Sequence, residues 1–184
     1  AVLLKNEDGI LPLKKNARIA VVGAMAKNLR YQGAGSSHIN PTKLSQPIDF
    51  LPNTIFAQGC DDKGYTTDDL LKEAMEVAQK AEIVVVFAGL PDQCESEGFD
   101  RENMKMTEGH LRMIDIVTKV NSNTVVVLLS GGVVECPWAD SVKGILYMGL
   151  PGQAGGEAIA DILYGRVNPG GKLAESWPYT YKDV

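Results

Sequence analysis

Five short apolar runs, each bounded by glycine or polar residues, alternate with longer segments along this chain of 184 residues. The runs are rich in β-branched residues and too short for helices, so each predicts a buried strand. Because helical patterns lie between them, the strands are expected to form a parallel sheet covered on both faces. The sequence therefore predicts an α/β fold. The predicted strands are residues 18–23, 54–58, 82–88, 125–129 and 144–148.

Helices are expected in the intervening segments. Thr67 is the N-cap of the clearest helix, whose first turn carries two aspartates where negative charge is favourable. Thr107 caps a second helix, and Gly155–Leu163 forms a third. A short helix is also expected within Thr42–Leu51, limited by Pro47.

Length and composition bound the class of protein. With 45% hydrophobic and 22% charged residues, the chain is typical of a globular protein, and residues 1–184 are expected to form one domain. A net charge of −5 provides no basic surface for phosphates, which argues against nucleic acid as a partner. Since no apolar run approaches the roughly 18 residues of a membrane span, no membrane partner is expected either.

The cysteines and the first residues of the chain indicate the cellular compartment. Cys60, Cys94 and Cys136 form no CxxC pair and no Cys/His cluster, so they are expected to be reduced thiols without a metal. Ala1–Leu4 is followed at once by charged Lys5, a pattern that predicts no signal peptide. Together these features predict a cytoplasmic protein.

Glycine-rich loops follow four of the predicted strands, and parallel strands bring such loops to one edge of the sheet, where ligands bind. The loop after the third strand carries Glu95, Glu97 and Asp100. A carboxylate at this place is either a catalytic acid or half of a salt bridge, and the residues alone rank Glu95 and Glu97 equally. Arg101 is expected to pair with Asp100 or Glu102 and so fix the loop.

The loop after the first strand contains Ser36, Ser37 and His38. The hydroxyls either contact a ligand or form a turn, and the histidine either reaches a ligand or is solvated; we take all three as candidate substrate contacts. Gly33-Ala34-Gly35 lies ten residues past Gly23, and no helix opens from it, so a dinucleotide turn is not supported. The chain also lacks the Gly-x-Ser-x-Gly elbow of esterases.

Three further side chains are assigned to structure. His110 lies in the first turn of a predicted helix and is expected at the surface. Trp138 follows the loop of the fourth strand and is expected to pack in the core rather than stack on a sugar. Trp177 is expected to close the edge of the core.

Four segments form a recognisable set: AVLLKNEDGILPL at 1–13, YQGAGSSHINP at 31–41, EGFDR at 97–101, and the closing run at 152–173, which contains GQAGG, DILYG and NPGGKL. Together they resemble the second domain of glycoside hydrolase family 3, the β-glucosidase family. Each segment alone is modest, but they occur in the family's order and cover nearly the whole chain. The resemblance is therefore specific.

The resemblance implies a three-layer α/β sandwich. Its sheet has six strands, five parallel and one antiparallel, with helices on both faces. The five strands expected from the apolar runs fill five positions, and Lys172–Trp177 is expected to supply the sixth.

The resemblance also implies a function. In this family a retaining mechanism uses an aspartate nucleophile on a (β/α)8 barrel, and a glutamate acid/base comes from the sandwich domain. By its place in the acidic loop Glu97 matches that acid/base, with Asp100 and Arg101 as supports. The barrel and its Ser-Asp-Trp nucleophile motif are absent, since Trp138-Ala139-Asp140 does not match the motif. The implied partners are a β-linked glucoside or related glycoside and the barrel domain of the same protein, and no cofactor is implied.

The chain is thus expected to be the second domain of a retaining β-glycosidase, in the first instance a β-glucosidase, and to be inactive without its barrel. The alternative is a noncatalytic carbohydrate-binding or interaction module, and a third hypothesis is a flavodoxin-like nucleotide binder. The sugar stays open among the glucosidases, xylosidases and arabinofuranosidases of the family. Its N-acetylglucosaminidases are disfavoured because they usually lack this acid/base arrangement.

Overall fold

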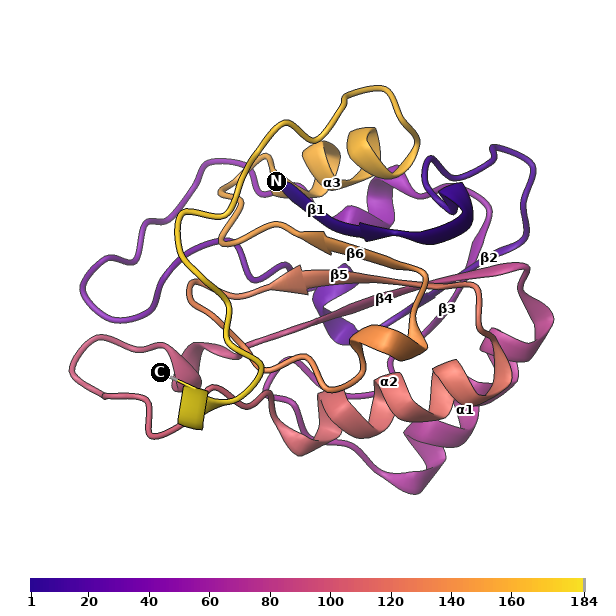
Figure 1. Ribbon diagram of the computed structural model, residues 1–184. Helices are drawn as coiled ribbons and strands as arrows, with labels where there is room; N and C mark the ends of the chain where they lie inside the picture. The colour runs from indigo at the N-terminus through magenta and orange to yellow at the C-terminus, as the bar shows by residue number, and fades with distance from the viewer. Residues whose placement is uncertain (184) are drawn as a thin grey trace.

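The computed structural model describes residues 1–183 and contains one six-stranded sheet with the strand order β1-β6-β5-β4-β2-β3 (Figure 1). The strands β2 to β6 pair in parallel, and β1 pairs with β6 in antiparallel fashion. The α/β class and the five predicted strands are therefore confirmed. The strands are β1 (Val2–Asn6), β2 (Ile19–Val22), β3 (Thr54–Ala57), β4 (Ile83–Gly89), β5 (Thr124–Leu129) and β6 (Gly144–Tyr147).

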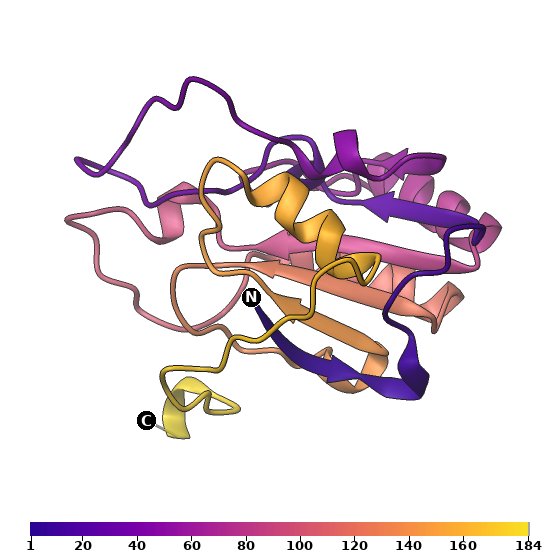
Figure 2. The ribbon, with the colours of Figure 1, turned by 90° about the horizontal axis from the view of Figure 1, so that it is seen from above.

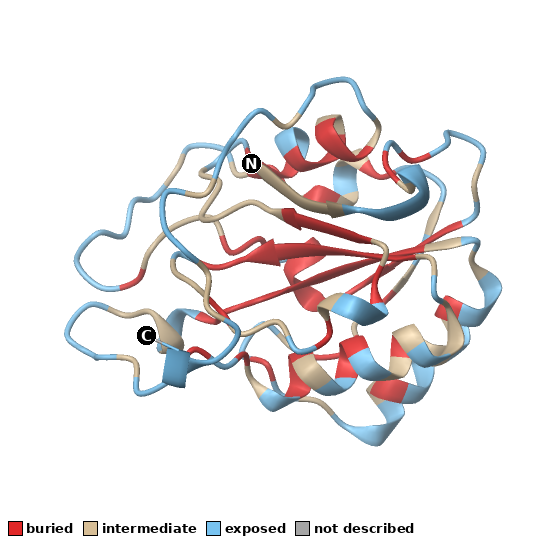
Figure 3. Cartoon of the chain, in the orientation of Figure 1, coloured by how far each residue is buried: buried red, intermediate tan, exposed pale blue. Residues whose placement is uncertain are grey.

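The central strands are buried on both sides, which explains why their sequences are continuous apolar runs (Figure 3). In β4, Val84 and Val86 face one core cluster while Val85 and Phe87 face the other. All four of these side chains are inaccessible to solvent. A parallel sheet of this kind needs a cover on each face.

Helices supply both covers and make three layers (Figure 1). The helices α1 (Asp68–Lys80) and α2 (Glu108–Val120) contact each other and pack their apolar faces on one side of the sheet. On the other side lies α3 (Gly155–Leu163), which begins and ends where the sequence predicts. It contacts a 3-10 turn at Pro47–Phe50.

The sixth strand was assigned to the wrong segment. It is β1, whose Val2 lies opposite Tyr147 and whose Asn6 lies opposite Gly144. β1 takes the antiparallel edge position beside β6, and residues 172–177 are coil. Trp177 nevertheless packs edge-on against Tyr147, with ring centroids 5.0 Å apart, so its expected place at the core edge is confirmed.

The short helix expected within residues 42–51 is reduced to the 3-10 turn at Pro47–Phe50. Before this turn, Ser45 forms hydrogen bonds with residues at the start of α3. The Ser45 amide donates to the Gln153 carbonyl at 2.9 Å, and the Ser45 hydroxyl accepts from the Gly156 amide at 3.0 Å. Ser45 thus satisfies an amide at the start of α3, a role that a helical conformation of its own segment would preclude.

The two threonine caps behave differently. The Thr67 hydroxyl accepts from the Leu70 amide, as expected for an N-cap. The Thr107 hydroxyl instead bonds to His110 Nδ1 at 2.8 Å. His110 is only 1% exposed, so its predicted surface position is wrong. The first turn of α2 packs closely against the backbone of Gly64 and Tyr65, and the helical pattern alone does not show that this turn is enclosed.

Within residues 1–183, every helix is too short or too polar to cross a lipid bilayer.

Candidate functional site

The chain leaves β2 and β4 toward opposite faces of the sheet, and this divergence opens a crevice at their carboxyl ends. The β2 loop, residues 23–46, leads to the face covered by α3, while the β4 loop, residues 90–107, leads to α2 on the other face. Because β2 and β4 are neighbours, this is the switch point at which open α/β sheets bind ligands. Figure 2 shows both loops extending beyond the same edge of the sheet.

Glu97 lies where the two loops meet. A bridge pairs Ala34 of the β2 loop with Ser96 of the β4 loop. Next to it, Glu97 Oε2 accepts hydrogen bonds from the Ser36 amide, at 3.0 Å, and from the Ser36 hydroxyl. The Glu97 side chain is otherwise exposed. The site thus presents a carboxylate to the outside and holds it by one oxygen.

The hydrogen bonds from Ser36 change the acidity of Glu97. The hydroxyl, and then the amide, hold the pKa of Glu97 below its usual value, because both donors favour the charged form. A general acid must be protonated when substrate binds. Glu97 in this chain therefore needs a further neighbour, apolar or negatively charged, before it can act as one.

Glu95, two residues earlier, is held at both oxygens. Oε2 accepts from the Gly131 amide at 2.9 Å, and Oε1 accepts from the Gly132 amide at 2.8 Å. Arg30 Nη2 lies 3.5 Å from Oε2, and only 11% of the Glu95 side chain is exposed. With both oxygens accepting hydrogen bonds inside the chain, Glu95 has no oxygen free for a substrate. The structure therefore separates two glutamates that the sequence ranked equally.

Arg30 is the functional-site residue that the sequence reasoning missed. Its side chain is 6% exposed, and its Nε lies 2.8 Å from Asp92 Oδ1. Its Nη1 donates to the Leu90 carbonyl at 2.9 Å, which ties the β2 loop to the β4 loop. A signal was present, since Arg30 belongs to a loop predicted to lie beside three acidic residues. Paired in this way, a buried arginine fixes the geometry of both loops.

Arg101 does not form the ion pair expected of it. Its Nη1 donates to the Val133 carbonyl at 2.8 Å, so it joins the β4 loop to the loop after β5. Asp100 and Glu102 are exposed, and neither forms an ion pair within residues 1–183. Arg101 thus fixes the loop through a backbone carbonyl, and the supporting role of Asp100 stays a prediction.

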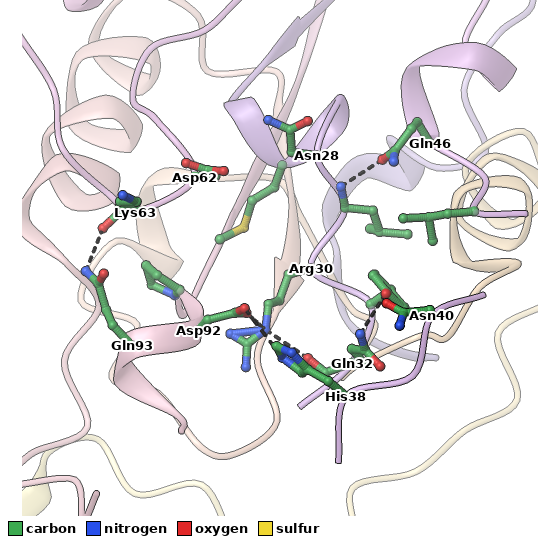
Figure 4. A pocket seen from close by; sticks show the side chains of 15 residues that line it. Asn28, Arg30, Gln32, His38, Asn40, Gln46, Asp62, Lys63, Asp92 and Gln93 are labelled. Carbon is green, nitrogen blue, oxygen red and sulfur yellow. Dashed lines mark hydrogen bonds and ion pairs between the residues drawn. The ribbon is translucent and has the colours of Figure 1, made fainter. Parts of the chain in front are cut away.

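A polar cleft of about 590 Å³ lies beside these contacts, between the two loops (Figure 4). His38 and Asp92 lie on its wall, with His38 Nε2 3.9 Å from Asp92 Oδ2. Ser37 is not part of its lining; the Ser37 hydroxyl lies 3.5 Å from the Ala34 carbonyl. A lining rich in amides suits ligands with many hydroxyl groups, since an amide both donates and accepts. The amides that line the cleft belong to Asn28, Gln32, Asn40, Gln46 and Gln93.

The remaining candidate side chains are structural. Trp138 is 7% exposed and packs in the core, as expected. Burial raises the pKa of both Cys60 and Cys136 to about 12, so neither thiol is a ready nucleophile. Among residues 1–183, no group of three or more His, Cys, Asp or Glu side chains is placed to hold a metal ion.

Comparison with known proteins places this geometry in context. The family model described as glycosyl hydrolase family 3 C-terminal domain matches residues 1–184. The thermostable β-glucosidase B of Acetivibrio thermocellus is 50% identical over 186 aligned residues, which cover 96% of this chain and 24% of that protein. An exo-α-(1→6)-L-arabinopyranosidase of Bifidobacterium breve is 43% identical, over 99% of this chain and 26% of that protein.

A solved structure gives the same result. The crystal structure of the Bifidobacterium adolescentis GH3 β-glucosidase superposes with a TM-score of 0.94 at 46% identity, over 99% of this chain and 28% of that one. The chain therefore spans about a quarter of the length of the relatives that it matches.

Proposed function

Because the chain belongs to glycoside hydrolase family 3, in which it is the C-terminal domain, we propose that it supplies the general acid/base of a retaining β-glycosidase, in the first instance a β-glucosidase. The proposed acid/base is Glu97. One observation carries the choice: Glu97 stands at the switch point with one carboxylate oxygen free, whereas Glu95 has both oxygens bonded within the chain.

The proposed chemistry has two steps. In the first, the protonated Glu97 carboxyl gives its proton to the leaving-group oxygen while a second carboxylate attacks the anomeric carbon. In the second, the Glu97 carboxylate takes a proton from the water that releases the sugar. Since retaining enzymes keep the two carboxyl groups about 5–5.5 Å apart, the attacking group has to approach Glu97 closely. We propose that it comes from a (β/α)8 barrel domain of the same protein.

A second domain packed against Glu97 would also raise its pKa. In this chain Glu97 is exposed and its pKa is lowered by Ser36, so the carboxylate form is favoured. Apolar walls and a nearby nucleophilic carboxylate both disfavour the charge and raise the pKa of such a group. The proposed barrel therefore completes the acid as well as supplying the nucleophile.

The proposed substrate is a β-linked glucoside or a related glycoside. Relatives named for a β-glucosidase and for an α-L-arabinopyranosidase are both more than 40% identical to this chain. A domain similar to this one thus occurs in enzymes named for different sugars, which supports placing most sugar recognition elsewhere in the protein. His38 on the cleft wall and Ser37 in the same loop are the proposed contacts to the leaving-group part.

The test is the substitution Glu97→Gln in the full-length protein. Loss of the acid/base is expected to lower kcat/KM by about 10²- to 10⁴-fold on glycosides with poor leaving groups, such as disaccharides. Activated aryl glycosides need less protonation and are expected to suffer less in the first step. Azide is expected to restore part of the lost turnover on these substrates by attacking the glycosyl-enzyme intermediate.

Glu102→Gln is the matched control, because it removes an exposed glutamate of the same loop that forms no ion pair within residues 1–183. Its activity is expected to equal that of the wild type. Unchanged disaccharide hydrolysis by Glu97→Gln would reject the acid/base assignment. That outcome would favour the alternative of a noncatalytic carbohydrate-binding module.

A further inference from the structure

Building on the proposed function, we propose that Ser36 is the positioning residue of the Glu97 carboxyl group: its two donors hold Oε2 and leave Oε1 to carry the catalytic proton. The role is a positioning one, because Ser36 acts on Glu97 rather than on the substrate.

The geometry of the contact is specific to one oxygen. The Ser36 amide donates to Glu97 Oε2 at 3.0 Å, and the Ser36 hydroxyl donates to the same atom. Glu97 Oε1 accepts no hydrogen bond from any residue between 1 and 183. The two oxygens of one carboxylate are therefore in different environments, although the side chain as a whole is exposed.

The backbone of the β2 loop is shaped for this approach. Gly35 has a φ of +88°, a conformation that side chains other than glycine rarely adopt. A Cβ at this position would lie 2.7 Å from Glu97 Cβ, which is too close for two carbon atoms. A glycine immediately before Ser36 therefore lets the loop come near enough for both donors to reach Oε2. The Ala34–Ser96 bridge holds the same two segments together.

The arrangement matches what an acid/base has to do. When Glu97 is the acid, Oε1 carries the proton, the Oε1–H bond breaks, and the glycosidic oxygen takes the proton along with the electron pair of its bond to carbon. When Glu97 is the base, Oε1 accepts the proton of the attacking water. Oε2 accepts from Ser36 in both states, so the carboxyl group does not have to rotate between the two steps.

Ser36 also affects the pKa of Glu97, and the pH profile of the enzyme measures this effect. Both of its hydrogen bonds favour the carboxylate over the acid, so removing the hydroxyl makes Glu97 easier to protonate. For a retaining enzyme, the basic limb of the kcat/KM profile reports the loss of the proton from the acid. A residue that merely supported the loop would lower activity without moving this limb in a defined direction.

The experiment compares Ser36→Ala, Ser36→Thr and Ser122→Ala in the full-length enzyme by their pH profiles of kcat/KM on a disaccharide. Ser36→Ala is expected to move the basic limb to higher pH by roughly 0.5–1 unit and to lower activity at the optimum several-fold. Ser36→Thr keeps the hydroxyl and is expected to restore the position of the limb. Ser122→Ala is the control, since this exposed serine lies between α2 and β5, at the opposite end of the parallel strands from Glu97.

The inference is overturned if Ser36→Ala leaves the basic limb in place, or if Ser122→Ala moves it equally. Its failure is distinguishable from failure of the proposed function. If Glu97→Gln abolishes disaccharide hydrolysis while Ser36→Ala has a wild-type profile, Glu97 is the acid/base and Ser36 does not position it. If Glu97→Gln is fully active, the acid/base assignment fails and the positioning role fails with it.

Discussion

Glu95 and Glu97 stand two residues apart on one loop, and the chain treats their carboxylates in opposite ways. Glu95 is nearly buried, with both oxygens bonded to backbone amides of the next loop and Arg30 beside it. Glu97 is exposed and is held through one oxygen only. We infer a division of roles: the Glu95 carboxylate fixes the β4 loop to the loop after β5, and the Glu97 carboxylate is the proposed acid/base.

The largest effect that tests this division is expected from Glu95→Gln in the full-length enzyme. The amide that replaces one oxygen turns a donor toward a backbone N–H and removes one of the two carboxylates beside Arg30, so that only Asp92 remains. The β4 loop is then expected to shift, and a displacement of about 1 Å at a catalytic group lowers the rate by about 10²-fold. The measurement is kcat/KM on a disaccharide, alongside hydrogen exchange of residues 95–102.

A fall in activity with faster exchange across the loop is the expected result for an anchor. Glu102→Gln again serves as the control, and it should change neither quantity. If Glu95→Gln lost activity while exchange in the loop stayed as slow as in the wild type, Glu95 would act chemically, and the division between the two glutamates would be wrong.

The two histidines of the chain also differ in burial: His110 is buried, and His38 is half-exposed. Burial lowers the pKa of His110 to about 4, with nearby Asp61 offsetting part of the shift. Between pH 6.5 and about 4 the unfolded chain therefore binds more protons than the folded one, and the free energy of unfolding falls as the pH falls. From pH 7 to pH 5 this single group is expected to remove about 2 kcal/mol.

Urea unfolding of the chain at pH 7 and pH 5 measures this loss. Carboxylates and other groups titrate in every variant, so the informative quantity is the difference in pH dependence between the wild type and His110→Gln. The wild type is expected to lose about 2 kcal/mol more than the variant. His38→Gln is the matched control, because it removes a half-exposed histidine from a loop. Equal losses in the wild type and His110→Gln would mean that the His110 ring is open to water.

The smallest effect is expected from His38→Ala in the full-length enzyme. A side chain on the wall of the cleft that contacts the leaving-group part adds binding to both ground and transition states. KM on a disaccharide is therefore expected to rise roughly 3-fold with little change in kcat. An aryl glycoside with a small leaving group provides the comparison substrate. A drop in kcat with KM unchanged would instead assign His38 to the chemical step.

Local patterns predicted most of the elements. The apolar runs identified five strands, and Gly155–Leu163 was predicted to the residue, because periodicity and glycine punctuation act within a few positions of the chain. The sixth strand was misplaced, since its pairing joins β1 to β6, which lie about 140 residues apart in the sequence. His110 was misplaced for a related reason, because the turn that carries it packs against residues 64–65 of another loop.

For the candidate site too, the sequence determined one part and the tertiary structure the other. The sequence by itself determined that acidic and hydroxyl side chains follow parallel strands and must meet at one edge of the sheet, since strand direction alone decides where those loops emerge. Only the tertiary structure decided which carboxylate is free, because that depends on Ser36, Arg30 and the amides of residues 131–132. These groups come from the loops after β2 and β5, and they meet the glutamates of the β4 loop because the strand order is β5-β4-β2. No local pattern in the chain encodes that order.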